Sequence, residues 1–304
     1  MFIIKYRKFF IALSALFVVL SIIALVSFGL PLGIDFKGGS ELQLAYTDVR
    51  PEQSVIMDKL TNAGFGDAKV QSTGDKGIMV KSRDLTDPER VAMVAALTDN
   101  GAIAAVPENF TTIGPSVGAE LKHKSIISIL FVLIAIICFV AYAFRNVSKP
   151  VSSWKYGLAV IIALIHDIAI PTGAFALIAH YTGAELDTLF VVALLTTLAL
   201  SISDTIVVFD RIRETEHTFR KKGSVFIINR AINDMLGRTL ITSGTVFVTS
   251  LCLYLFAGGI VSDIAFAISI GIFFGTYSSI YVAAPLILIM EKLNLAPSQT
   301  AQKA

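Results

Sequence analysis

The chain of 304 residues is too apolar to be a water-soluble protein. Hydrophobic residues make up 55% of it and charged residues 16%, whereas soluble domains carry about 25% charged residues. Its mean hydropathy is +0.74, and such a chain would expose a large apolar surface to water. We therefore expect most of it to face lipid. The net charge of only +2 also argues against nucleic-acid binding.

The charges are concentrated in one part of the chain. Residues 30–124 hold 10 Lys/Arg and 13 Asp/Glu, and the remaining 209 residues share 25 charges. This distribution predicts a membrane bundle with one water-soluble insertion. We expect a first span within 1–29, an exported domain over 30–124, the remaining spans with a cytoplasmic loop 210–238 over 125–290, and a tail over 291–304.

Six segments are long enough to cross a bilayer as helices. About 20 apolar residues are needed for a hydrocarbon core about 30 Å thick, and this length is reached by 9–29, 125–144, 157–179, 188–209, 239–260 and 264–290. The first segment is longer than the apolar region of a signal peptide, which has about 7–15 residues. We therefore interpret it as a retained membrane anchor.

The Lys/Arg residues next to the spans predict the orientation. They lie on one side of the predicted membrane: Lys5, Arg7, Lys8, Arg145, Lys149, Lys155, Arg211, Arg213, Arg220, Lys221, Lys222, Arg230, Arg238, Lys292 and Lys303. The two short opposite loops, 181–187 and 258–263, contain neither Lys nor Arg. We expect both termini in the cytoplasm and residues 30–124 outside it.

The inserted domain has the pattern of a small α/β fold. Alternating apolar residues predict strands, and apolar residues at helical spacing predict helices that begin near a proline and end near a glycine. The elements follow the order β-α-β-β-α-β, over 41–46, 51–63, 68–72, 78–82, 88–100 and 110–113. This order is that of a ferredoxin-like fold.

The cytoplasmic loop between the fourth and fifth spans also has helical periodicity. Its apolar stripe consists of Val225, Ile228, Ile232 and Leu236 within a basic context. This pattern predicts a helix that lies at the membrane surface.

Few ionisable side chains remain inside the predicted spans. They are His166, Asp167 and Asp204, with Arg238 at the mouth of the fifth span. A charge within the membrane costs at least a few kcal/mol, so each such residue is a candidate for function.

Asp204 is the strongest of these candidates. It shares a predicted helix face with Thr197 and Ser201, and Arg238 begins a second polar stripe with Thr242, Thr245 and Thr249 on the next span. Two such stripes on antiparallel helices can face each other. Desolvation favours the protonated carboxyl, while a nearby guanidinium favours the ionised form. Movement of Arg238 relative to Asp204 could thus couple a proton gradient to a conformational change. The alternative is a static buried ion pair or a hydrogen-bonded carboxyl that only fixes helix register.

The role of His166 and Asp167 in the third span stays open. Neighbouring residues of a helix point about 100° apart, so we expect that the two side chains cannot both face one partner. A proton relay and a packed polar pair are both compatible with the sequence.

No enzyme signature is present. Asp167 and Asp204 do not lie in the Gly-x-Gly-Asp setting of an intramembrane aspartyl protease, and the chain has no P-loop, no metal-spaced His/Cys cluster and no Gly-x-Ser-x-Gly motif. We expect neither catalysis nor a cofactor nor a metal.

Five segments together resemble the SecF family of protein translocase subunits, within the SecD/SecF group of the RND-like superfamily. They are GIDFKGG at 33–39, IGPSVG at 113–118, HD at 166–167, DTIVVFDRIRE at 204–214 and FGTYSSIY at 274–281. The family usually has Asn before the fourth-span aspartate, where this chain has Ser203. A hydroxyl at that position leaves the local hydrogen bonding open, and Ser201, Ser203 and Thr242 complete a possible secondary polar site with His166 and Asp167.

The resemblance implies a fold and a function. The fold would be a bundle of six transmembrane helices, like half of an RND-type transporter, with a ferredoxin-like periplasmic domain between the first two. The function would be that of an accessory subunit that couples the proton-motive force to late, periplasmic stages of protein export, with Asp204 and Arg238 as the proton-coupling pair.

The implied partners are a SecD-like subunit, the SecYEG channel, YajC- or YidC-like membrane proteins, the unfolded exported polypeptide, protons and membrane lipid, in a bacterial inner membrane. An RND-type transporter half that moves a lipid or a small molecule is the alternative function. A scaffold without proton chemistry is a third.

Overall fold

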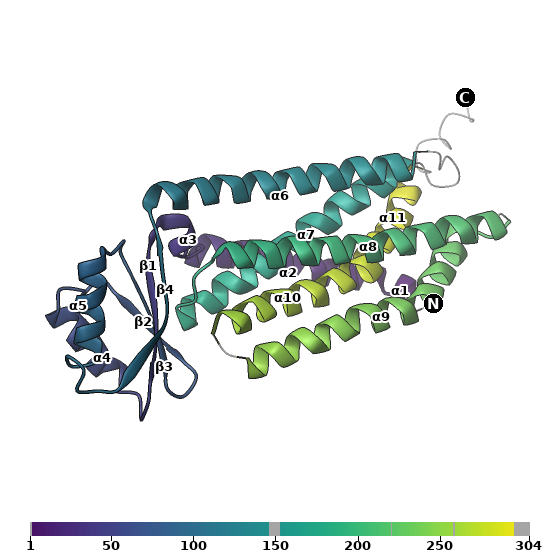
Figure 1. Ribbon diagram of the computed structural model, residues 1–304. Helices are drawn as coiled ribbons and strands as arrows, with labels where there is room; N and C mark the ends of the chain where they lie inside the picture. The colour runs from purple at the N-terminus through teal and green to yellow at the C-terminus, as the bar shows by residue number, and fades with distance from the viewer. Residues whose placement is uncertain (1, 146–152, 220, 258, 295–304) are drawn as a thin grey trace.

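The protein is mostly helical, with a long helical bundle and a small α/β domain at one end of it (Figure 1). The computed structural model describes residues 2–145, 153–219, 221–257 and 259–294. Most of the predicted tail 291–304 lies outside the described residues, as do Lys149, Arg220 and Lys303 of the basic set used to predict the orientation.

Within the described residues, six helices are long and apolar enough to cross a membrane, as the sequence predicts. The last of them is continuous but contains a π-helical turn, so that it has three parts. After the short helix α1 (Phe2–Lys5), the spans are α2 (Arg7–Phe28), α6 (Pro115–Ala143), α7 (Ser153–Thr182), α8 (Thr188–Thr218), α9 (Ser224–Phe256), and α10 (Gly259–Tyr277) with η1 (Ser278–Ala283) and α11 (Ala284–Asn294).

Two helices begin earlier than the apolar runs indicate. Helix α6 starts at Pro115, because Gly114 has an extended N-cap conformation and proline suits the first helical turn. The predicted surface helix over 225–236 is the first part of α9 rather than a separate element. Its residues Ile228 and Ile232 are buried in the core of the bundle, so its stripe packs against protein rather than lying on the membrane surface.

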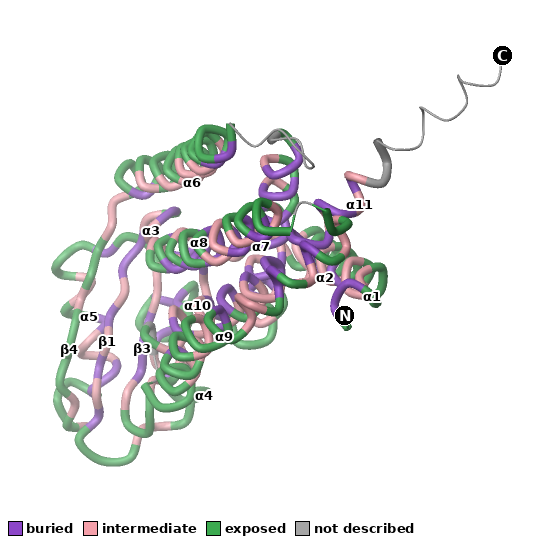
Figure 2. Tube along the Cα trace, turned by 90° about the vertical axis from the view of Figure 1, so that its right-hand side faces the viewer, coloured by how far each residue is buried: buried purple, intermediate pink, exposed green. Residues whose placement is uncertain are grey.

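The bundle has buried central helices and exposed outer ones. In the most apolar part of each helix, half of α7 and of α8 is buried, and 61% of the last span, but only 6% of α6 and 11% of α9. The tube coloured by burial shows α6 as exposed over most of its surface (Figure 2). Lipid or another protein must therefore cover α6 and α9.

The inserted domain has the predicted ferredoxin-like order. Its sheet is antiparallel with the strand order β2-β3-β1-β4, and two helices cover one face of it (Figure 1). In chain order the elements are β1 (Gly39–Tyr46), α4 (Gln53–Asn62), β2 (Lys69–Thr73), β3 (Gly77–Ser82), α5 (Asp87–Leu97) and β4 (Ala105–Ile113).

The core of this domain follows from strand alternation. Leu42, Leu44 and Tyr46 on β1 are at most 2% exposed, because every second side chain of a strand faces the same side. They pack with buried side chains of α4 and α5 such as Ile56 and Leu97. Fold and core are thus those expected for an independent small domain.

The domain is joined to the bundle by two glycine-rich segments in backbone contact. Gly38 and Gly39, after the short helix α3 (Ile34–Lys37), have φ of +79° and +142°, which only glycine adopts readily. A Cβ on Gly118 would lie 2.7 Å from the Gly38 nitrogen. The segments 33–39 and 113–118 therefore meet with no side chain between them.

Candidate functional site

Asp204 lies on α8 in a polar pocket against α9. The pocket has a volume of about 220 Å³, and its polar lining residues are Ser203, Asp204, Arg238, Thr239, Thr242 and Ser243. Ser243 donates a hydrogen bond of 2.5 Å from its hydroxyl to Oδ2 of Asp204. A carboxyl group in a membrane-spanning helix is thus held between two helices and borders a space that can admit water or another side chain.

Arg238 lines the same pocket without bonding to Asp204. Its side chain is exposed, and within the described residues it forms neither a hydrogen bond nor an ion pair. The guanidinium therefore lies near the carboxyl while remaining free to approach it or to leave it. The geometry that the sequence suggested, with both residues beside one another on adjacent helices, is present without a direct ion pair.

The threonines of the predicted stripe on α9 do not face Asp204 with their hydroxyls. Thr242, Thr245 and Thr249 donate to backbone carbonyls of their own helix, at 3.0, 2.8 and 2.9 Å. The partner of Asp204 is Ser243, one position away from the predicted stripe. Ser243 was not predicted from the sequence, because the prediction relied on the threonines, and a threonine hydroxyl can instead bond to a carbonyl on the preceding turn of its own helix.

The three polar residues predicted to share one face of α8 do not all contact the same neighbouring helix. Thr197 donates to the carbonyl of Leu194, and the hydroxyl of Ser201 bonds to Asp167 on α7 and Gly275 on α10. Both pack against glycines of α10: a Cβ on Gly271 would lie 2.6 Å from Oγ1 of Thr197, and one on Gly275 would lie 2.8 Å from Cβ of Ser201. These glycines allow α8 and α10 to approach closely.

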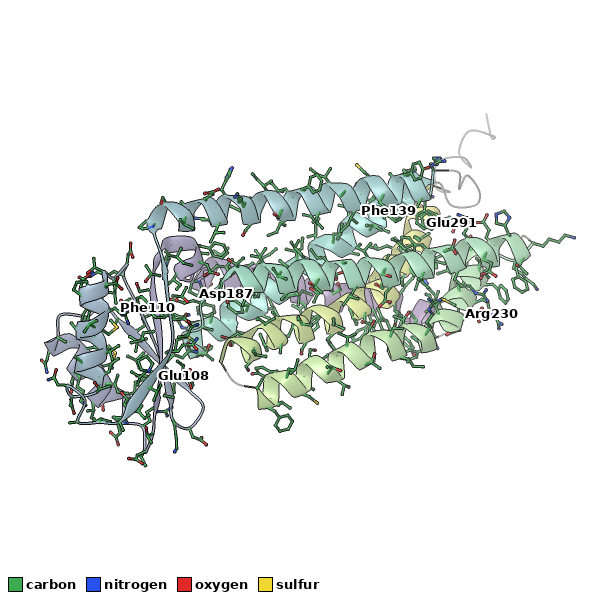
Figure 3. The ribbon with its side chains drawn as sticks, viewed as in Figure 1. Glu108, Phe110, Phe139, Asp187, Arg230 and Glu291 are labelled. Atoms are coloured by element: carbon green, nitrogen blue, oxygen red, sulfur yellow. The ribbon has the colours of Figure 1, made fainter. Side chains whose placement is uncertain are left out.

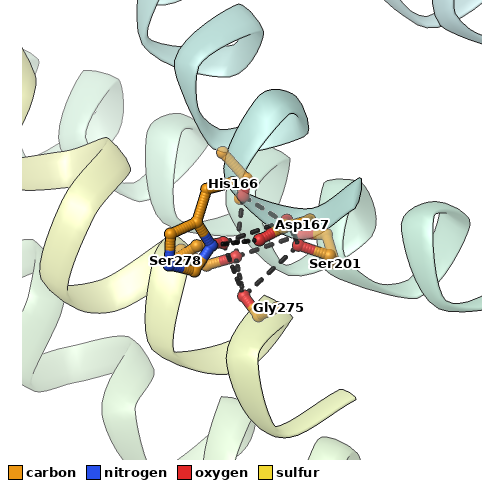
Figure 4. A network of polar contacts seen from close by, with 7 residues as sticks. His166, Asp167, Ser201, Gly275 and Ser278 are labelled. Atoms are coloured by element: carbon orange, nitrogen blue, oxygen red, sulfur yellow. Dashed lines mark hydrogen bonds and ion pairs between the residues drawn. The ribbon is translucent and has the colours of Figure 1, made fainter. Parts of the chain in front are cut away.

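A second buried carboxyl lies at the centre of the bundle (Figure 4). Oδ2 of Asp167 accepts hydrogen bonds from the hydroxyls of Ser201 at 2.5 Å and Ser278 at 3.0 Å. Oδ1 lies 2.8 Å from Nδ1 of His166. Asp167 and His166 are each 2% exposed, so this network is buried inside the bundle.

His166 and Asp167 bond to each other but have different further partners. Only Asp167 reaches Ser201 and Ser278, which agrees with the expectation that the two side chains cannot both face one partner. The His166 ring stacks on Tyr277, with centroids 6.2 Å apart. Ser278 was not among the predicted site residues; two consecutive serines in an apolar span were the signal that could have identified it.

A third polar region lies where the domain meets the bundle. Asp35 and Asp187 accept hydrogen bonds from the backbone N–H groups of Thr188 (2.9 Å) and Phe190 (2.8 Å) in the first turn of α8. Burial raises the pKa of Asp187. A cavity of about 440 Å³ adjoins these residues, and Figure 3 shows Asp187 between the sheet and the helices.

An ion-paired carboxylate strengthens this junction. Glu185 on the loop before α8 bonds to Lys69 of β2 at 2.7 Å and lies 3.5 Å from Lys81 of β3. Its side chain is only 8% exposed. The domain is thus held to the bundle by electrostatic contacts on this side.

Family models and relatives agree on what the chain is similar to. Residues 93–293 match the family described as protein export membrane protein SecD/SecF, C-terminal, and residues 23–48 match the SecD/SecF GG motif. The protein translocase subunit SecF of Thermobaculum terrenum is 38% identical over 305 residues, covering 95% of this chain and 93% of the relative. That of Vibrio alginolyticus is 33% identical, covering 98% and 93%.

Solved structures share the fold. The crystal structure of SecDF from Thermus thermophilus, described as a translocon-associated membrane protein, matches with a TM-score of 0.82 and 31% identity over 95% of this chain. SecDF in a super-membrane-facing form matches with a TM-score of 0.69 and 32% identity over 99%. This chain spans 38% and 40% of those two longer chains. It belongs to the SecD/SecF family of protein export membrane proteins, and within that family it is of the SecF type.

Proposed function

We propose that this SecF-type subunit couples proton movement to protein export, with Asp204 as the proton-binding carboxyl and Arg238 as its mobile counter-charge. The observation that carries the proposal is the pocket between α8 and α9. It holds a carboxyl inside a membrane-spanning helix together with a guanidinium that forms neither a hydrogen bond nor an ion pair in the described part of the chain.

The chemistry of this pocket allows two states. With Arg238 withdrawn, desolvation favours a protonated Asp204, and with Arg238 close, its positive charge favours the ionised carboxyl. A long arginine side chain can extend inward from a helix end. A change in the packing of α8 against α9 would thus take up or release a proton, and a proton gradient would drive that change.

We infer that a SecD-like subunit supplies a second half of the bundle. The two relatives of known structure are SecDF chains that extend well beyond the region matched here. The helix α9 presents exposed polar residues such as Thr242 and Thr245, which a neighbouring helix would shield better than lipid. In this arrangement the chain lies in a bacterial inner membrane with both termini inside and the α/β domain in the periplasm.

The further partners of the proposal follow from this role. The complex would associate with the SecYEG channel, and with YajC- or YidC-like membrane proteins, and would act on unfolded exported polypeptides. The chain then serves as a transport component rather than a catalyst.

Export assays in membrane vesicles test the proposal. Asp204→Asn, in a chain assembled with its SecD-like partner, is expected to abolish the part of export that depends on the proton-motive force while the complex still assembles. Asp210→Asn, on the exposed end of the same helix, is the control and should retain export. Export close to wild-type in the Asp204→Asn vesicles would contradict the proposal.

Arg238 is tested by two variants. Arg238→Ala should lose proton-dependent export, and Arg238→Lys should retain part of it, since a positive charge remains but the shape changes. If Arg238→Ala lowered only the amount of protein in the membrane, the residue would have a structural role.

A further inference from the structure

We propose that the buried pair His166 and Asp167 is a second proton-binding site, which exchanges protons with Asp204 through Ser201 and one water molecule. This inference rests on the proposed function for the role of Asp204. It assigns a chemical role to Asp167, a residue that the proposed coupling at Asp204 and Arg238 does not use.

A small cavity lies between Asp204 and Ser201, the residue whose hydroxyl bonds to Asp167. It has a volume of about 10 Å³ and is lined by Ser201, Asp204, Ser243 and Thr276, among others. This volume corresponds to about one water molecule, which needs two to four polar partners, and the lining provides them. Ser201 therefore borders the cavity of Asp204 while its hydroxyl bonds to Asp167 at 2.5 Å.

The hydrogen bonds around Asp167 fit both of its protonation states. A serine hydroxyl has one proton to donate, and Ser201 and Ser278 each have two acceptors within reach. One is Oδ2 of Asp167, at 2.5 and 3.0 Å, and the other is the carbonyl oxygen of Gly275, at 3.3 and 2.9 Å.

In the ionised state both hydroxyls donate to Oδ2 of Asp167. In the protonated state Oδ2–H donates to Ser201, and Ser201 and Ser278 turn their protons to the carbonyl of Gly275. Only hydroxyl rotation separates the two states, so no buried group loses its partner.

His166 gives the pair a second position for the proton. Its Nδ1 lies 2.8 Å from Oδ1 of Asp167, and its Nε2 is buried with no hydrogen-bond partner. With Nδ1–H donating to an ionised Asp167, the free lone pair on Nε2 can accept a proton.

The surroundings contain few other charges. From the elements packed against the pair, the nearest titratable groups are Tyr277 on α10, whose ring stacks on His166, and Asp204 on α8, which shares the small cavity with Ser201. In the described parts of α2, α7, α8 and α10, no Lys or Arg bonds to His166 or Asp167.

The transfer step conserves atoms and charge. Asp204 gives its proton to the water, the water gives a proton to the oxygen of Ser201, and Ser201 gives its own proton to Oδ2 of Asp167. The water and the hydroxyl are restored, and one O–H bond is exchanged for another. The π-helical segment η1, which carries Ser278, borders this path, and such segments often occur at functional sites.

Infrared difference spectroscopy between two pH values tests whether Asp167 titrates. In the full chain, Asp167→Asn and Asp204→Asn should each remove a different carboxylic acid band. Ser278→Ala, which keeps the carboxyl, should shift the band that Asp167→Asn removes. A difference spectrum that both Asp167→Asn and Ser278→Ala leave unchanged would overturn the proposal, and it would do so whatever the result for Asp204.

Proton flux in vesicles that contain the assembled complex tests the connection. Ser201→Ala should lower proton flux about tenfold or more, because it removes a buried hydrogen bond to a charged group. Ser250→Ala is the matched control, since Ser250 is buried to the same extent as Ser201 but bonds to Ser269; it should retain the flux. If Asp204→Asn abolished proton flux and Ser201→Ala left it intact, the connection would be wrong while the proposed function stood.

Discussion

The carboxylate of Asp35, just after the first span, accepts a hydrogen bond of 2.9 Å from the backbone N–H of Thr188, the first residue of the fourth span. The two residues are 153 positions apart in the chain. The contact places a negative charge at the positive end of the helix that carries Ser201 and Asp204, where the helix dipole favours it. The glycine-rich segment 33–39 thus positions the functional helix as well as forming a turn.

Removal of this carboxylate should destabilise the bundle. We expect Asp35→Ala to lower the free energy of unfolding by about 1 kcal/mol, as for loss of a helix cap, and Asp35→Asn to lower it less, since its amide oxygen still accepts. Thermal unfolding of the full chain in detergent measures both effects. Asp48→Ala, at an exposed acidic residue, should leave the midpoint unchanged; an equal loss there would show that net charge alone is responsible.

The glycine contact at the domain junction should not tolerate a methyl group. A Cβ on Gly118 would lie 2.7 Å from the nitrogen of Gly38, whereas one on Gly114 meets nothing within 4 Å. Gly118→Ala is expected to cost about 1–3 kcal/mol through overpacking, and Gly114→Ala to cost much less. Denaturant unfolding compares the two variants, and equal stability would refute the steric explanation.

The capping box of α5 should make the inserted domain sensitive to acid. Hydrogen bonds from Arg83, and then from Thr86, hold the pKa of Glu89 at about 2, against an ordinary value of 4.5. Because the pKa is lower in the folded state, its contribution to stability is present above pH 4.5 and is lost as the pH falls toward 2. Glu89→Gln should therefore weaken the pH dependence of the unfolding midpoint in this range.

The control for this prediction is Glu108→Gln, on the exposed part of β4. It should keep the wild-type fall in midpoint with acid. A Glu89→Gln chain that lost stability with acid as steeply as the wild type would assign the acid sensitivity to other carboxylates.

The ion pairs of Glu185 should restrict movement of the domain. Glu185→Gln removes its charge opposite Lys69 and Lys81, and we expect a wider distance distribution between spin labels at Glu108 and Tyr181. The measurement uses a chain in which the two cysteines are replaced. In the wild type, added salt should widen the distribution in the same direction, although less, because the buried carboxylate is partly protected from screening.

The comparison variant is Glu120→Gln, which removes an exposed pair with Lys124 on α6. It should leave the distribution unchanged. Identical distributions for Glu185→Gln and wild type would mean that other contacts hold the domain in place.

The fold could be predicted from the sequence because its signals are local. The length of apolar runs gave six spans, and strand alternation gave the order of the inserted domain, both confirmed. Helix ends were less predictable: α6 begins at Pro115, well before its apolar run, because the polar residues near Lys122 continue the helix. Hydropathy cannot distinguish a polar helical turn from a loop.

The candidate site was predictable in its residues but not in its partners. Rarity of ionisable groups in the spans identified Asp167, Asp204 and His166, since each costs energy in lipid. The bonds to Ser243 and Ser278 depend on how far each helix is rotated about its axis, and the alternating polar pattern does not fix that rotation. The hydrogen bond from Ser278 to Asp167 also joins two spans that are far apart in the sequence. The prediction from the sequence paired only consecutive spans and therefore could not include it.

The backbone contact between Gly38 and Gly118 has a mechanical consequence. It leaves no side chain that could rearrange, whereas the bond between Glu185 and Lys69 on the other side can break and re-form. The inserted domain is therefore attached by a fixed backbone contact on one side and by a breakable ion pair on the other. A tilt that breaks the ion pair would pivot at the start of α6, and it would pull on the loop before the first turn of α8, which carries Glu185.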